Sequence, residues 1–120
     1  MINDIQIDTN FKLYEFQSPD TQTVMLDPEL LGRLQNVRDR LARPVNVASG
    51  YRTPAHNAAV GGAPGSFHMK GMAADITVKG ITIDQLADTC KQAGFRGVII
   101  YRGDGHVHVD TRPNQYYAEG

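Results

Sequence analysis

The sequence lacks most of the features that identify a protein class at once. Its 120 residues contain one cysteine, Cys90, which excludes an intramolecular disulfide framework and a cysteine-based zinc knuckle. No stretch approaches the roughly 20 consecutive apolar residues of a membrane-spanning helix, and the first residues lack the basic and apolar segments of a signal peptide. We therefore expect no membrane partner and find no recognisable export signal. Because there is only one cysteine, any metal must be bound by histidine and carboxylate side chains.

The sequence also lacks an excess of charge of either sign. Lysine and arginine total 12 and aspartate and glutamate 13, which gives a formal net charge of −1. This balance argues against nucleic-acid binding through a basic surface. A chain of this length buries roughly 65% of the surface that its unfolded form exposes, so it needs no disulfide or metal to fold. We expect a single domain over residues 1–120 and, without a heptad seam or a long apolar edge, a monomer.

Two segments have the pattern of amphipathic helices. The first has Asp27 as its N-cap, a proline at its first helical position and an end at Pro44. The second begins near Thr82 and has Gly94 as its C-cap. One or two helical turns are also expected within residues 54–60, before a stretch rich in glycine and proline that excludes regular structure.

Runs rich in β-branched residues predict about four strands, at residues 45–48, 73–78, 97–101 and 107–111. The last two flank a glycine-containing turn and are expected to form a hairpin. Residues 1–26 are rich in turns and are expected to lie as a strap over the core, held by Phe11, Leu13 and Phe16. This order of elements predicts an α+β fold, with a small, largely antiparallel sheet and helices packed on one side.

Three of the four histidines lie in two segments that also carry aspartates. His106, His108 and Asp110 alternate with valines in a predicted strand and therefore share one face. His68 and Asp75 bracket a short flexible segment that lets a loop histidine and a strand aspartate converge. Two histidines and one aspartate with an open fourth position are what catalytic zinc requires, and such a site lowers the pKa of bound water toward ~7. The sequence thus indicates hydrolysis of an amide or ester.

Several short motifs, in this order, resemble a known family. They are Ser-Gly-Tyr-Arg ending at Arg52, Ser-Phe-His ending at His68, Ala-Ala-Asp ending at Asp75, and His-Val-His-Val-Asp at residues 106–110. They are similar to the zinc D-Ala-D-Ala carboxypeptidase family of peptidoglycan peptidases, which is related to lysostaphin-type enzymes and the hedgehog domain. The resemblance extends over about residues 11–112. It implies a hedgehog-like fold, one Zn²⁺ ion and hydrolysis of an amide bond in peptidoglycan stem peptides or cross-links, by carboxypeptidase or endopeptidase action.

Roles in the site are also implied by the resemblance. The positions that match the zinc ligands of the family are His68, Asp75 and His108. Arg52 matches an arginine that holds a substrate carboxylate or the polarised carbonyl oxygen. His106 matches the first histidine of the pair, which stabilises or moves charge beside the metal. His56 and Asn57 are expected to brace the glycine-rich loop through hydrogen bonds rather than to bind metal.

The general base is where the sequence departs from the family. Some members carry a glutamate or aspartate three residues before the last ligating histidine, and this chain has Gly105 there. Two alternatives stay open for the base, Asp104 on a glycine-flanked turn and His106. The departure also supports a second hypothesis, a metal-binding or cell-wall-binding module of the same fold without peptidase activity. A purely structural metal site is disfavoured because such sites usually have four protein ligands.

The substrate implied by the resemblance, a peptidoglycan peptide, lies outside the cytoplasm. We therefore expect the chain to act at the bacterial cell wall, in the periplasm or outside, after release or export. Similar short domains occur in phage lysis proteins and as the catalytic part of longer exported chains, and either origin fits the sequence.

Overall fold

Helix α1 (Pro28–Leu41) begins where the sequence predicts in the computed structural model, which describes residues 2–120. The Asp27 side chain accepts a hydrogen bond from the backbone N–H of Glu29 at 3.3 Å, which satisfies one free donor of the first turn. The helix ends at Ala42, whose left-handed backbone (φ 52°) turns the chain before Pro44. The residues of α1 that are buried in the core include Leu30, Leu34 and Val37.

The second predicted helix is also present. Helix α3 (Ile83–Gln92) begins with a capping box between Thr82 and Gln85, and Gly94 follows its end with a φ of +96°. A short helix, α2 (Pro54–Ala59), fills the segment where one or two helical turns are expected. Within residues 2–120, no helix is both long and apolar enough to cross a membrane.

The main sheet has five strands in the order β3-β4-β6-β5-β7. Its first four strands are β3 (Asn46–Ser49), β4 (Ala73–Thr77), β6 (His106–Asp110) and β5 (Gly97–Tyr101). They pair antiparallel throughout and lie within one residue of the predicted strands, so the antiparallel sheet and the β5–β6 hairpin are confirmed.

The fifth strand corrects the prediction of about four strands. Strand β7 (Tyr116–Glu119) pairs parallel to β5 and makes the sheet mixed. Three of its four residues are exposed, so it lacks the alternation of buried and exposed residues that identifies a strand. Its pairing depends on the exposed edge of β5, which a local pattern does not reveal.

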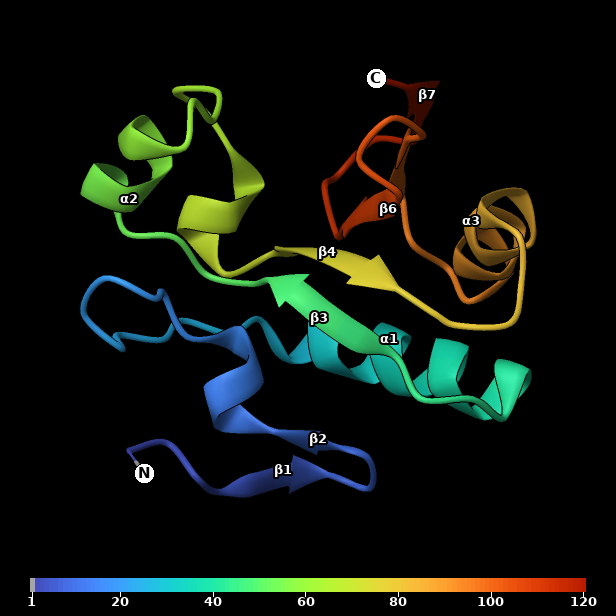
Figure 1. Ribbon diagram of the computed structural model, residues 1–120, viewed down its shortest axis with the longest axis horizontal. Coiled ribbons are helices and arrows are strands. Elements are labelled where there is room, and N and C mark those ends of the chain that lie inside the picture. Colours follow the sequence, from blue (N-terminus) through green and yellow to red (C-terminus); the bar gives the residue numbers. More distant parts are fainter. Residues whose placement is uncertain (1) are drawn as a thin grey trace.

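Helices α1 and α3 share one hydrophobic core under the sheet. They pack against each other, and α3 also packs against β5 and β6 (Figure 1). Val107 and Val109 of β6 are fully buried in this core, so the histidines that alternate with them point to the opposite face. Helices therefore cover one face as predicted, while α2 lies apart from them (Figure 1).

The N-terminal segment lies over the edge of the core, as the predicted strap does. Its described part, residues 2–26, contains a two-stranded hairpin, β1 (Gln6–Asp8) and β2 (Phe11–Lys12), and a 3₁₀ helix, η1 (Leu13–Phe16). Phe11 and Phe16 are buried with ring centroids 5.9 Å apart, whereas Leu13 is only partly buried. The backbone oxygen of Phe16 accepts a hydrogen bond from the N–H of Tyr51 at 2.8 Å, so the strap fixes the segment after β3.

Candidate metal centre

The register of the sheet places two of the predicted ligands side by side. Asp75 of β4 is paired directly with His108 of β6. Ser49 of β3 pairs with Asp75 on one side, and Ile99 of β5 pairs with His108 on the other. Directly paired residues of antiparallel strands point to the same face. One row across four strands therefore carries both ligands, away from the core.

His68 reaches this row from a short 3₁₀ helix, η2 (Phe67–Lys70). Ser66 caps η2 by accepting a hydrogen bond from the N–H of His68, and Gly71 ends it with a φ of +68°. The ring Nδ1 of His68 lies 2.7 Å from the carbonyl oxygen of Gly50. Because that oxygen can only accept, Nδ1 carries the proton, and the lone pair on Nε2 faces Asp75 Oδ1 at 3.3 Å.

His108 is oriented by a second carboxylate. Its Nε2 lies 2.7 Å from Asp110 Oδ2, and its Nδ1 lies 3.3 Å from Asp75 Oδ1. With the proton on Nε2 donated to Asp110, the lone pair of Nδ1 faces Asp75. Asp110 thus orients the ring of His108 through a direct contact. Each of the two predicted ligand histidines has its second ring nitrogen fixed, as in known metal sites.

The geometry of the three side chains fits a metal ion. They offer one ligand atom each, and all three atoms lie within 4.8 Å of one another. Two atoms bound about 2.0–2.1 Å from a tetrahedral zinc ion lie about 3.3 Å apart, the distance from Asp75 Oδ1 to either histidine nitrogen. Two imidazole nitrogens and one carboxylate oxygen suit zinc and leave its fourth position free.

The electrostatics of the cluster also favour a cation. Burial alone would raise the pKa of Asp75, but hydrogen bonds and charge interactions with His108 and His68 hold it well below its usual range. Burial would lower the pKa of His108, but hydrogen bonds to Asp110 and Asp75 outweigh it and raise that pKa. The buried carboxylates thus stay ionised and attract positive charge to the point between the rings.

Arg52 is held beside the cluster by three hydrogen bonds. Its Nη2 donates to Asp75 Oδ2 at 3.1 Å, its Nε to Ser49 Oγ at 3.2 Å and its Nη1 to Asn57 Oδ1 at 3.4 Å. Asn57 in turn donates to the carbonyl oxygen of Ala63 at 2.9 Å, so it braces the glycine-rich loop as expected. His56 lines a smaller cavity of about 300 Å³ and is not one of the three clustered residues.

The two candidates for the general base lie at different distances from the cluster. His106 Nε2 is 3.7 Å from Asp75 Oδ1, and the ring packs beside that of Tyr101 with centroids 5.1 Å apart. Asp104 is exposed on the β5–β6 turn, where its own N–H donates to the carbonyl oxygen of Tyr101 at 3.1 Å. The structure therefore brings His106 to the cluster and leaves Asp104 at the rim.

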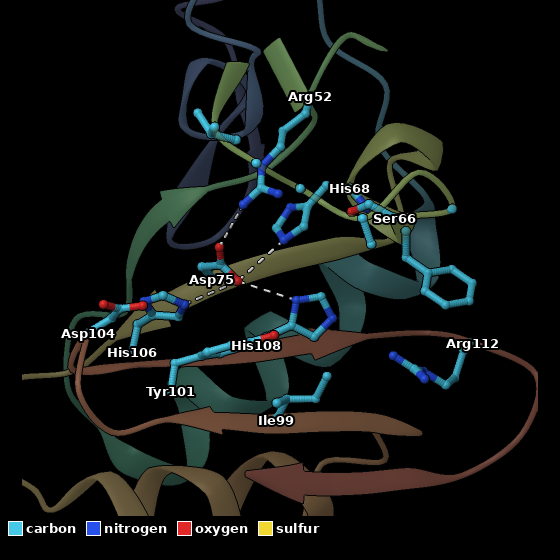
Figure 2. A pocket seen from close by; sticks show the side chains of 16 residues that line it. Arg52, Ser66, His68, Asp75, Ile99, Tyr101, Asp104, His106, His108 and Arg112 are labelled. Carbon is cyan, nitrogen blue, oxygen red and sulfur yellow. Dashed lines mark hydrogen bonds and ion pairs between the residues drawn. The ribbon is translucent and has the colours of Figure 1, made fainter. Parts of the chain in front are cut away.

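One cavity of about 510 Å³ contains all six predicted site residues (Figure 2). The glycine-rich loop that follows α2 lines one side of it, and residues of β5 and β6 line another. A family model described as Peptidase M15 matches residues 9–110, which is most of the chain. The chain belongs to the peptidase M15 family. The family indicated by the motifs is therefore confirmed.

Curated relatives are similar to this chain over much of its length. The peptidoglycan L,D-endopeptidase MepK of Escherichia coli strain K12 is 30% identical over 99 residues, which cover 77% of this chain and 54% of that protein. The probable peptidoglycan L,D-endopeptidase MepK of Haemophilus influenzae is 29% identical over 100 residues, with the same coverage. The chain spans about half the length of the curated relatives it matches.

Two residues of this M15 site were missed by the sequence reasoning. Arg112 donates from Nε and Nη2 to the two carboxylate oxygens of Asp110, at 2.8 and 2.6 Å. Gly97 is paired with Asp110 across β5 and β6 and leaves the space that the carboxylate fills. The Asp-x-Arg spacing at a strand end was the available signal for Arg112, since residues two apart in extended chain point the same way. No comparable signal marks Gly97.

Proposed function

We propose that this M15 chain is a zinc-dependent peptidase that hydrolyses an amide bond in peptidoglycan stem peptides or their cross-links. The observation that carries this proposal is the convergence of three buried ligand-type side chains, in which Asp75 Oδ1 lies 3.3 Å from a ring nitrogen of each histidine, the separation that two ligands of a tetrahedral zinc ion have. The peptidoglycan peptidases among its relatives support the substrate class. We also propose that the protein acts at the bacterial cell wall.

In this proposal His68, Asp75 and His108 hold the zinc ion. Zinc in an open site supplies a Lewis acid for the carbonyl of the cleaved bond and a water molecule activated near neutral pH. Arg52 neutralises the second oxygen of Asp75 and, with its remaining N–H groups, donates hydrogen bonds to the carbonyl oxygen of the substrate.

His106 is the better candidate for moving the proton. Its Nε2 faces the cluster at 3.7 Å from Asp75 Oδ1, whereas Asp104 is exposed at the rim. General acid–base catalysis requires hydrogen-bond reach to the reacting groups, directly or through one water molecule. His106 meets this requirement with less movement of the chain than Asp104 would need.

Endopeptidase action is favoured over carboxypeptidase action. The cavity follows β6 along its length and has lining residues before and after the strand, Asp104 and Arg112. A peptide therefore has room on both sides of the metal centre. The relatives named as L,D-endopeptidases point the same way.

A second candidate function is a cell-wall-binding module without hydrolysis. The observation that favours it is Gly105, which stands where some members of the family carry a carboxylate. In this alternative the three ligands bind zinc and the cavity binds the peptide, but no residue takes the proton.

Digestion of purified peptidoglycan distinguishes the two functions. The zinc-loaded protein is expected to release fragments whose masses identify the cleaved bond, and His68→Ala is expected to release none. His56→Ala is the matched control, because it removes a histidine outside the cluster. His106→Gln is expected to slow cleavage roughly 10²-fold or more and Asp104→Asn far less. Full activity of His68→Ala would refute the peptidase, and zinc binding without cleavage would favour the binding module.

A further inference from the structure

The cavity beside the metal centre has two chemically different ends. Strand β6 runs along it from His106 to Asp110, and its ends lie about 13 Å apart at the usual rise of a strand. Asp104 lies at one end, and Arg112 lies at the other (Figure 2). The acidic group is exposed, whereas the arginine is enclosed by several side chains.

Aromatic rings hold Arg112 in a fixed position. Its guanidinium carbon lies 4.9 Å from the ring centroid of Phe67 and 4.8 Å from that of Tyr116. Lys70 adds a second cation at this end, since its Nζ lies 5.1 Å from the same Phe67 centroid. Together with the two hydrogen bonds to Asp110, these contacts fix the guanidinium before any ligand arrives. The Arg112 side chain therefore loses little conformational entropy when a ligand binds.

The two arginines of the cavity differ in the donors that they leave free. Each of the three guanidinium nitrogens of Arg52 donates to a protein acceptor. Arg112 binds Asp110 with Nε and Nη2, and its Nη1 forms no hydrogen bond within residues 2–120. Its side chain is 19% exposed and points toward the cavity (Figure 2). Arg112 therefore offers an anion a nitrogen that Arg52 does not.

We propose that Arg112 determines specificity by binding a carboxylate of the peptide substrate, so that peptides with a free carboxylate on this side of the cleaved bond are selected. The inference rests on the proposed function, because it takes the ligand to be a peptide that crosses the cavity. Guanidinium N–H groups form strong, charge-assisted hydrogen bonds with carboxylates. Arg52 then takes the other of its two expected roles, which is to donate hydrogen bonds to the carbonyl oxygen of the cleaved bond beside the metal.

The test measures peptide binding to the zinc-loaded protein by titration calorimetry. The probes are a synthetic peptidoglycan tetrapeptide ending in D-Ala, its C-terminal carboxamide, and the same peptide with its side-chain carboxylates amidated. One of the two amidated forms is expected to bind about tenfold more weakly than the free acid. The form that loses affinity shows whether the terminal or a side-chain carboxylate is bound.

The Arg112→Gln variant is expected to bind the free acid and the amidated forms with equal affinity. Arg112→Lys keeps a positive charge beside Asp110 and is expected to retain part of the preference. Arg40→Gln, which removes an exposed arginine of α1, is the matched control and is expected to keep it in full. The zinc affinity of each variant is measured in parallel.

Three results would overturn the inference. They are equal binding of all three probes by the unaltered protein, an unchanged preference in Arg112→Gln, and an equal loss of affinity for all probes together with weaker zinc binding. The last result would show that Arg112 acts only through Asp110 on the metal ligand. Because binding is measured and not cleavage, a protein that prefers the free acid but cleaves no peptide supports the role of Arg112 while refuting the peptidase.

Discussion

Gly97 shows how the absence of a side chain shapes the metal centre. A Cβ atom at this position would lie 2.0 Å from Asp110 Oδ1 and 2.3 Å from its Cγ, far closer than real contacts allow. The carboxylate of Asp110 therefore occupies space that only glycine leaves. From there it accepts hydrogen bonds from His108 and Arg112, and these contacts hold its pKa well below the usual range although burial opposes this.

Gly97→Ala is expected to weaken zinc binding. The added methyl group displaces Asp110, and loss of a carboxylate that orients a ligand histidine lowers metal affinity by about 10- to 100-fold. Competition with a chromophoric chelator measures the change. Gly32→Ala is the control, since a Cβ there meets nothing within 4 Å apart from its chain neighbours and the backbone of its own helix, and the helix gains a better helix former. Unchanged zinc affinity in a folded Gly97→Ala protein would show that Asp110 does not support the metal centre.

The residues that form the cluster could be predicted from the sequence, whereas two of the residues that support it, Arg112 and Gly97, were not predicted. His68, Asp75 and His108 are metal-ligand types in a predicted loop and two predicted strands, and the structure brings their ligand atoms together. Arg112 and Gly97 take their roles from contacts with Asp110. The Asp-x-Arg spacing was a local signal for Arg112, but the strand register that places Gly97 opposite Asp110 and the two aromatic rings beside Arg112 do not follow from local sequence.

At the scale of elements, helix α1 is tied to the segment that carries Arg112. Arg96 donates to both carboxylate oxygens of Glu29, at 2.9 and 3.1 Å, and to the carbonyl oxygen of Thr111 at 2.9 Å. The hydroxyl of Thr111 also donates to Asp27, the N-cap of the helix, at 2.7 Å. The first turn of α1 thus fixes the chain just beyond β6.

Glu29→Gln is expected to lower the melting temperature by a few degrees at pH 7. Pairing with Arg96 lowers the pKa of Glu29 in the folded protein, so its stabilisation is present above the unfolded pKa and is lost as the pH falls through the folded value. The difference between the variant and the unaltered protein should therefore shrink in acid. Thermal unfolding from pH 7 to pH 3 measures it, with Asp88→Asn as a surface control. A difference that persists at pH 3 would contradict the ion pair as its cause.

The elements differ in how far they follow from local sequence. Both long helices carry their own start and stop signals, such as Asp27 before α1 and Gly94 after α3, and were predicted within two residues. The four antiparallel strands carry β-branched runs. Strand β7 has no comparable local signal, because its pairing with β5 determines it. The 3₁₀ helix η2 is a single turn of four residues, too short for a periodic pattern.

At the scale of the whole molecule, the candidate metal centre and the hydrophobic core lie on opposite faces of one sheet. The core is filled by α1, α3 and the inward residues of the strands, without any residue of the cluster. The strap packs against the site from outside, since a Cβ at Gly50 would lie 2.7 Å from Phe16 Cα. Just after the strap, the N–H of Asp27 donates to the carbonyl oxygen of Gly71 at 2.8 Å. We therefore expect the fold to depend on its core rather than on a metal.

Removal of metal is expected to leave the protein folded but less stable. Zinc at 1,000 times its dissociation constant stabilises a folded state by about 4 kcal/mol, so chelation should lower the melting temperature by several degrees and zinc should restore it. Circular dichroism at 25 °C should not change. His68→Ala is expected to show no response to zinc, and His56→Ala the full response. If the chelator unfolded the protein at 25 °C, the hydrophobic core alone would not be sufficient to keep the protein folded.

The metal centre is tested most directly by anomalous X-ray scattering from crystals of the zinc-loaded protein, recorded on both sides of the zinc absorption edge. The predicted result is one zinc peak at about 2.0–2.2 Å from His68 Nε2, an oxygen of Asp75 and His108 Nδ1, with no fourth protein ligand. A zinc peak bound by other residues, coordination through His108 Nε2, or a fourth protein side chain that closes the site would contradict the catalytic metal centre.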